Sequence, residues 1–175
     1  RDDESDLLKA GFSIFNAFNP HSTVIPWNRS NGVTSAISSP GESSFPIFGL
    51  GSHFLLDGNL EIKGSRDIAM FGRLGSSYGS RAETISILES LLDIGAKVST
   101  TPVEEILEMS LAEKFELQSQ DIIALGRVVN NGLPFVLETN RAVDILQALA
   151  LKEKYSLNLV LVSVEEAPMV IEQLK

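Results

Sequence analysis

The alternation of apolar and polar positions is clearest in the last quarter of the chain. An apolar run predicts a strand at residues 133–138, and a helically spaced apolar stripe predicts a helix at 140–155. A second apolar run at 159–162 and a helical pattern at 164–174 follow at once. Strands and helices that alternate with short connections are typical of parallel strands joined by right-handed crossovers. Residues 133–175 therefore predict a β-α-β-α unit.

The first 130 residues combine helical patterns with shorter strand patterns. Apolar spacing predicts a helix at 7–18 and a short one at 22–31, in which Pro26 indicates either a kink or a late start. An apolar run at 33–38 predicts a buried strand, and the polar residues 39–44 predict a loop beyond its carboxyl end. Further helices are predicted from about residue 80, from Pro102, and from residue 119 or 120.

A β-hairpin is predicted in the middle of the chain. Strand-like runs at 53–56 and 60–63 flank an Asp-Gly pair at 57–58, which is a strong signal of a tight turn. Residues 67–71 favour another short strand. We expect the hairpin to be an insertion in a sheet that is otherwise parallel and flanked by helices.

Composition limits the classes of function. A chain of 175 residues with 43% hydrophobic residues suits one domain or a large part of one. The net charge of -9 argues against a basic face for nucleic acid and against docking on anionic lipid. No apolar run is long enough to span a bilayer. We therefore expect no nucleic-acid partner, because of the charge, and no membrane insertion. The absence of Cys excludes disulfides and thiolate chemistry.

The chain begins with the polar run RDDESD, without an initiator Met or a signal-peptide pattern. We interpret the chain as a piece of a longer protein and expect residues 1–6 to be disordered. Because an upstream targeting signal would then be missing, export and a cytoplasmic location both stay open.

Metal and nucleotide motifs are weak in this sequence. The two histidines, His21 and His53, are far apart and in no metal-binding spacing, so we expect no complete metal site within the chain. The Gly-rich stretch at 72–79 lacks the Lys-Ser/Thr pair of a P-loop. We interpret this stretch as a flexible loop.

Glu138 is the candidate for a catalytic residue. It ends a predicted strand, and ligands bind beyond the carboxyl ends of parallel strands in α/β proteins. A carboxylate there could act as a general base or as a metal ligand. The alternative, which the sequence alone favours, is that Glu138 and Asn140 only cap the next helix, whose early Asp144 suits the helix dipole. Ser39, Thr139 and Asn140 are candidate substrate-binding residues, because each follows a strand that should end on the same face.

Three stretches share their order and spacing with a known family. They are NPHS with GVTSA at 19–36, SPG with FGLG at 39–51, and LPFV with NRAVDI and AL at 133–149. These stretches resemble the amidohydrolase superfamily, and the imidazolonepropionase-like amidohydrolases in particular. The similarity runs from about residue 7 to residue 175.

The resemblance implies a fold, a reaction and a metal. The fold would be a (β/α)8 TIM barrel, of which residues 1–175 are a single partial domain from the centre of the chain. The reaction would be hydrolysis of carbon–nitrogen bonds in small molecules such as cyclic amides or dipeptide-like substrates, with water activated by a divalent metal, zinc for example. The resemblance places the metal ligands before Arg1 and after Lys175. Family members also place a His on the strand that matches 136–139, where this sequence has Glu138 instead.

This departure leaves two functions level. The chain is either part of a metal-dependent hydrolase with an altered site, or a binding or scaffold domain on a barrel that has lost catalysis. A third, weaker alternative is an independent flavodoxin-like binding module, which rests on residues 133–175 alone. Because a partial barrel exposes strand edges and apolar helix faces, we expect a partner, either the rest of the same chain or a second copy.

Overall fold

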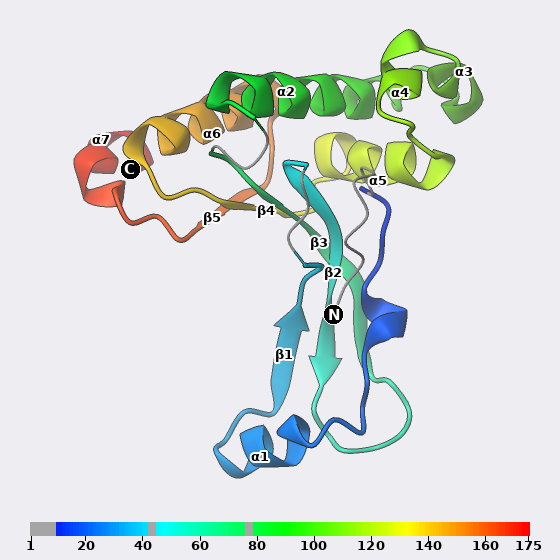
Figure 1. Cartoon of the computed structure of the whole chain (residues 1–175), viewed down its shortest axis with the longest axis vertical. Helices are drawn as coiled ribbons and strands as arrows, with labels where there is room; N and C mark the ends of the chain where they lie inside the picture. The colour runs from blue at the N-terminus through cyan, green and yellow to red at the C-terminus, as the bar shows by residue number, and fades with distance from the viewer. Residues whose placement is uncertain (1–9, 42–44, 76–78) are drawn as a thin grey trace.

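The structure, a computed structural model, describes residues 10–41, 45–75 and 79–175. Its centre is one mixed sheet of five strands in the order β1-β2-β3-β4-β5, which curls along its length (Figure 1). The strands are β1 (Ser35–Ser38), β2 (Ile47–Leu55), β3 (Gly64–Arg73), β4 (Phe135–Glu138) and β5 (Leu159–Val162). The sheet is open, so the described residues form a half-barrel and not a closed barrel.

The strand directions decide where a site can form. The pairs β1–β2 and β2–β3 are antiparallel, whereas β3–β4 and β4–β5 are parallel. The last three strands therefore end at one edge, where Glu138 is paired with Arg73 on one side and with Val162 on the other. This shared carboxyl edge is the place where α/β sheets bind ligands.

The helices gather around the β3–β5 half of the sheet, and α1 lies at the opposite end, beyond β1 (Figure 1). No described helix has both the length and the apolar character that crossing a bilayer requires. The helical elements are η1 (Phe15–Ala17), α1 (Val24–Ser30), α2 (Arg81–Lys97), α3 (Val103–Leu107), α4 (Ser110–Lys114), α5 (Ser119–Asn130), α6 (Ala142–Tyr155), η2 (Ala167–Val170) and α7 (Ile171–Leu174).

The core lies between β4 and the facing sides of α2 and α5. Two glycines let these helices approach closely: a Cβ at Gly95 would meet the Leu125 carbonyl oxygen at 2.7 Å, and one at Gly126 would meet Val98 at 2.8 Å. Burying the apolar faces of both helices is the main stabilising contribution here. Fully buried core side chains include Leu88, Leu91, Leu92, Ile122, Leu125, Phe135 and Leu137.

The second half of the fold follows the predictions closely. The strand at 159–162 is confirmed as β5, and the strand at 133–138 is confirmed in a shorter form as β4. The helix predicted from about residue 80 is α2, and the Ser80 hydroxyl accepts a hydrogen bond from the Glu83 N–H at 3.2 Å as its N-cap. The segment predicted as a helix at 164–174 is instead divided into η2 and α7, and the helix from Pro102 is divided into α3 and α4.

The helix predicted at 7–18 is wrong for the described part of that range. Phe12 and Ile14 lie beside Leu50 and exchange backbone hydrogen bonds with it, at 2.7 and 3.3 Å. Only one 3-10 turn, η1, follows, and Phe18 stacks on Phe54 with ring centroids 4.1 Å apart. Contacts with β2 thus override the local helical period. Residues 1–9 lie outside the described residues, and with them the start of this predicted helix and the disorder predicted for residues 1–6.

The strand predicted at 33–38 exists, but it is not buried. It is the edge strand β1, and Ile37 on it is 61% exposed. The short helix before it begins late, at Val24, which places Pro26 in its first turn and confirms one of the two expectations for this proline. Residues 42–44 of the predicted loop lie outside the described residues.

The predicted hairpin exists with longer strands and a wider loop. It joins β2 and β3 through residues 56–63, so the strand predicted at 60–63 is wrong, and residues 67–71 are part of β3. The hairpin is not an insertion, because β3 pairs directly with β4. β4 and β5 therefore continue the sheet of the hairpin, which speaks against an independent flavodoxin-like module at 133–175.

We expect the Asp57 carboxyl in the hairpin loop to titrate at about pH 2. Its pKa is lowered from 3.8 to about 2, because the Asn59 N–H and side-chain amide donate to it and Lys63 lies 3.1 Å away. A pKa that folding lowers adds stability above pH 3.8, and that stability is lost as the pH falls toward 2. NMR titration should show the midpoint rising in Asn59→Ala and Lys63→Ala, but not in Lys152→Ala on α6. A wild-type midpoint near 3.8 would contradict the loop geometry.

Candidate functional site

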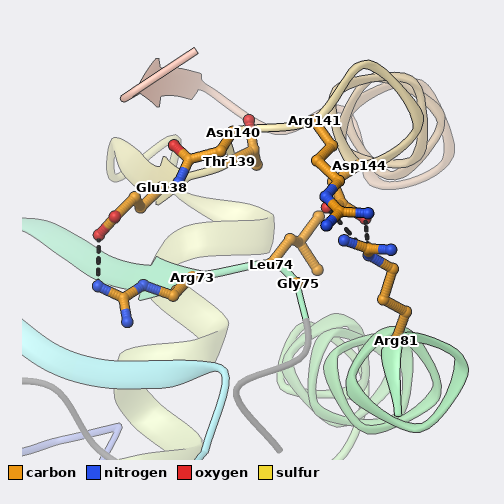
Figure 2. Close-up of a pocket in the computed structure, with 9 residues that line it drawn as sticks. All are labelled: Arg73, Leu74, Gly75, Arg81, Glu138, Thr139, Asn140, Arg141 and Asp144. Carbon is orange, nitrogen blue, oxygen red and sulfur yellow. Dashed lines mark hydrogen bonds and ion pairs between the residues drawn. The ribbon is translucent and has the colours of Figure 1, made fainter. Parts of the chain in front are cut away.

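A pocket of about 360 Å³ opens at the edge where β3 and β4 end. Its walls come from the ends of these two strands and from the first turns of α2 and α6, which follow them along the chain (Figure 2). The lining residues are Arg73, Leu74, Gly75, Arg81, Glu138, Thr139, Asn140, Arg141 and Asp144.

Glu138 lies in this pocket, but its carboxylate is committed to an ion pair. Arg73, its neighbour across the β3–β4 register, donates from Nη2 to Glu138 Oε2 at 2.9 Å (Figure 2). The two side chains are only 24% and 29% exposed, so water screens the pair incompletely. The Arg73 guanidinium also lies 5.9 Å from the centre of the Phe48 ring, which helps to fix its position.

The donors around Glu138 do not fit a zinc ion. Zinc takes three or four His, Cys or carboxylate ligands, whereas the polar side chains that line the pocket with Glu138 are three arginines, a threonine, an asparagine and a single further carboxylate. Across the described residues, no group of three His, Cys, Asp or Glu side chains is placed to hold a metal. His53 lies on β2 opposite Ile37, near the far end of the sheet.

A second ion pair joins the two helices that border the pocket. Arg81 Nε lies 3.2 Å from Asp144 Oδ1 and 3.3 Å from Oδ2 (Figure 2). Asp144 is 3% exposed and lies in the first turn of α6, where the helix dipole favours a negative charge. This pair holds the start of α2 against the start of α6.

Arg141 is the third arginine of the pocket, and its side chain is exposed. No ion pair links it to a carboxylate within the described ranges. Among the described lining residues, three arginines face two carboxylates, Glu138 and Asp144, so this part of the lining has one positive charge in excess. This local excess contrasts with the net charge of -9 of the chain.

Thr139 and Asn140 both line the pocket, as their position after β4 predicts. Thr139 is fully buried, and its Oγ1 has no hydrogen-bond partner among the described residues. The expected capping role of Asn140 is wrong, because α6 begins at Ala142 and has Arg141 as its N-cap residue. The Ala142 N–H instead donates to Glu166 Oε2 at 2.8 Å, so the cap comes from the segment after β5.

Ser39 does not share this pocket. It follows β1, whose last residue, Ser38, is paired with Ser52. On the other side of β2, the residues next to Ser52 are paired with Ser65, near the start of β3, and with Ala69, near its middle. β1 therefore ends well before the edge that carries Glu138, and the structure brings together Glu138, Thr139 and Asn140 without Ser39.

The sequence reasoning missed Arg73 and Arg81. Arg73 is the last residue of β3, two residues beyond the strand predicted there, and Arg81 directly follows the N-cap Ser80. The signal that could have found both is their position at the end of a parallel strand and the start of the next helix. The expectation of a hairpin insertion hid this signal, because it separated β3 from the parallel strands.

No protein-family model matches the sequence, and no curated protein is similar to it. Among solved structures, an amidohydrolase from Thermotoga maritima MSB8 has a similar fold, with a TM-score of 0.74 and 22% sequence identity. The similarity covers 97% of this chain and 46% of that one, so the chain spans about half the length of the solved structure. The chain therefore has the fold of part of that amidohydrolase, as the sequence resemblance predicted. The complete (β/α)8 TIM barrel and the imidazolonepropionase-like subtype stay predictions.

Proposed function

We propose that this chain forms about half of a hydrolase barrel that acts on carbon–nitrogen bonds of small molecules, such as cyclic amides or dipeptide-like compounds. The fold similarity to the Thermotoga amidohydrolase supports the proposal. The edge strand β5 supports it as well, because a further strand could pair with its open edge and the rest of a barrel would cover its exposed Val160 and Val162 side chains. The rest of the barrel would come from elsewhere in the full-length protein or from a second copy. The imidazolonepropionase-like subtype rests on the sequence stretches at 19–36, 39–51 and 133–149.

The observation that carries the proposal is the pocket at the carboxyl edge of β3 and β4. In barrels, the loops at this edge form the active site. In this half, the pocket would bind and orient the substrate, with Thr139 and Asn140 in its wall. Glu138 is paired with Arg73, so we assign it a positioning role and not that of a general base. A divalent metal such as zinc would need ligands outside this chain.

A binding or scaffold domain without catalysis is the second candidate. The Arg73–Glu138 ion pair favours it, because the guanidinium takes up the carboxylate that an altered metal site would use. The pocket would then bind a small molecule without converting it. Both candidates use the same pocket, and turnover distinguishes them.

We expect Glu138→Gln in the full-length protein to lower kcat by less than about tenfold, with the larger change in KM, because loss of the ion pair misplaces Arg73. Loss of a general base would lower kcat by about 10²–10⁴-fold. The assay would follow hydrolysis of dipeptides, N-acyl amino acids and cyclic amides, with and without added zinc. Glu153→Gln, an exposed change on α6, is the control.

The outcomes separate the candidates. Turnover by the wild type together with a small effect of Glu138→Gln supports the proposed hydrolase. A loss of a hundredfold or more in kcat, accompanied by loss of bound zinc, would make Glu138 a catalytic residue or ligand and overturn its positioning role. If no compound of the panel is hydrolysed while one of them binds saturably, the second candidate is correct.

A further inference from the structure

The pocket offers hydrogen-bond donors that its own ion pairs do not use. Arg81 contacts Asp144 only through Nε, and within the described residues no acceptor is paired with its two terminal nitrogens. Arg141 lies at the start of α6 and also has no ion-pair partner among the described residues. Both arginines line the pocket and reach toward the side where Asp144 lies (Figure 2). Two guanidinium groups are therefore available to one ligand.

The buried hydroxyl of Thr139 points to the same conclusion. Its Oγ1 has no hydrogen-bond partner among the described residues, although Thr139 lies in the pocket wall directly before Asn140 and Arg141. A buried polar group without a partner costs about 1–3 kcal/mol. This hydroxyl can donate or accept, so a carboxylate oxygen that accepted its hydrogen bond is one ligand group that would remove that cost.

The charge and shape of the lining define the ligand. An arginine presents a planar fork of N–H donors that matches a carboxylate through two parallel hydrogen bonds. The described lining residues have one excess positive charge, which balances a monoanion. A phosphate dianion would meet the fixed carboxylates of Glu138 and Asp144 without enough positive charge to offset them.

We propose that this pocket binds the carboxylate of a small organic acid, with Arg141 and the terminal nitrogens of Arg81 as the donors. The proposal deepens the proposed function, and rests on it, by naming the substrate class: an amide that also has a free carboxylate, such as an N-acyl amino acid. The carboxylate sits between the starts of α2 and α6, and the rest of the molecule extends over the ends of β3 and β4.

The test measures binding of N-acetylglycine to the full-length protein by NMR, with the neutral N-acetylglycinamide as a matched ligand. The wild type should bind the acid at least tenfold more tightly than the amide. Arg141→Ala should weaken binding of the acid about 10- to 100-fold, which corresponds to one charge-assisted interaction. Arg141→Lys keeps the charge but loses the planar pair of N–H donors, so its affinity for the acid should lie between those of the wild type and Arg141→Ala. Arg29→Ala on α1, at the other end of the molecule (Figure 1), should leave binding unchanged.

Arg141 is suited to this test because it is exposed and forms no ion pair with a described carboxylate, so its removal should not change the thermal midpoint. Equal affinity for the acid and the amide, or an Arg141→Ala variant that binds the acid like the wild type, would overturn the carboxylate site. Tighter binding of inorganic phosphate than of N-acetylglycine would overturn the choice of ligand. If the acid binds without turnover, the carboxylate site is supported and the proposed hydrolase function is wrong. If the protein hydrolyses the acid and Arg141→Ala changes neither turnover nor binding, the hydrolase function is supported and the carboxylate site is wrong.

Discussion

Replacing Phe135 with Ala should lower the free energy of unfolding by about 3–5 kcal/mol, the usual cost of removing a buried ring. Phe135 is 0% exposed and begins β4, the strand that the core of α2 and α5 covers. Its ring also lies close to β3, since a Cβ at Gly72 would be 3.3 Å from it. The neighbouring elements are held on both sides, so they can fill the cavity only in part.

Urea unfolding followed by circular dichroism would measure this loss. The matched control is Val160→Ala on β5, next to β4, where the side chain is 42% exposed. We expect this control to cost less than about 1 kcal/mol, since partly exposed positions lose little on truncation. Equal costs for both variants would contradict the central place of β4 in the core. A large cost for Phe135→Ala alone would show that the start of β4 anchors the strand whose other end carries Glu138.

The fold could be predicted where local pattern and tertiary contacts agree. β5 follows from a continuous apolar run, and the body of α6 follows from a helically spaced apolar stripe that buries Ile145, Ala148 and Leu151. The segment before α1 could not be predicted in this way, because Phe18 stacks on Phe54 and Phe12 bonds to Leu50, two partners remote in sequence. Local spacing contains no information on such partners.

The site was predictable only in part, for the same reason. Glu138 and Thr139 could be placed at a strand end from the sequence alone. Their chemistry could not, because Arg73 lies 65 positions from Glu138 along the chain and is opposite it only after β3 and β4 pair in parallel. Ser39 was misplaced because the strand before it is short and pairs with the far part of β2.

Arg81→Ala should destabilise the fold by about 2–3 kcal/mol, because it leaves the Asp144 carboxylate buried without its partner. Breaking a fully buried pair costs about 3–5 kcal/mol. The expected value is lower here, since the Arg81 side chain is 35% exposed and the start of α6 still stabilises the negative charge. Asp144→Ala should cost less, about 1–2 kcal/mol, because a freed arginine can reach water whereas a buried carboxylate cannot.

A double-mutant cycle measures the pair itself. The double variant of Arg81 and Asp144 should cost about 1–2 kcal/mol less than the sum of the two single variants, which is the range for groups in direct contact. The exposed pair of Lys154 and Glu89, whose side chains are 51% and 41% exposed, is the control and should show a coupling below about 0.5 kcal/mol. Additive costs at Arg81 and Asp144 would mean that other contacts, and not this ion pair, hold the two helices together. Strong coupling would mean that the ion pair fixes the distance between α2 and α6, and with it the spacing of the two arginines that we assign to the ligand carboxylate.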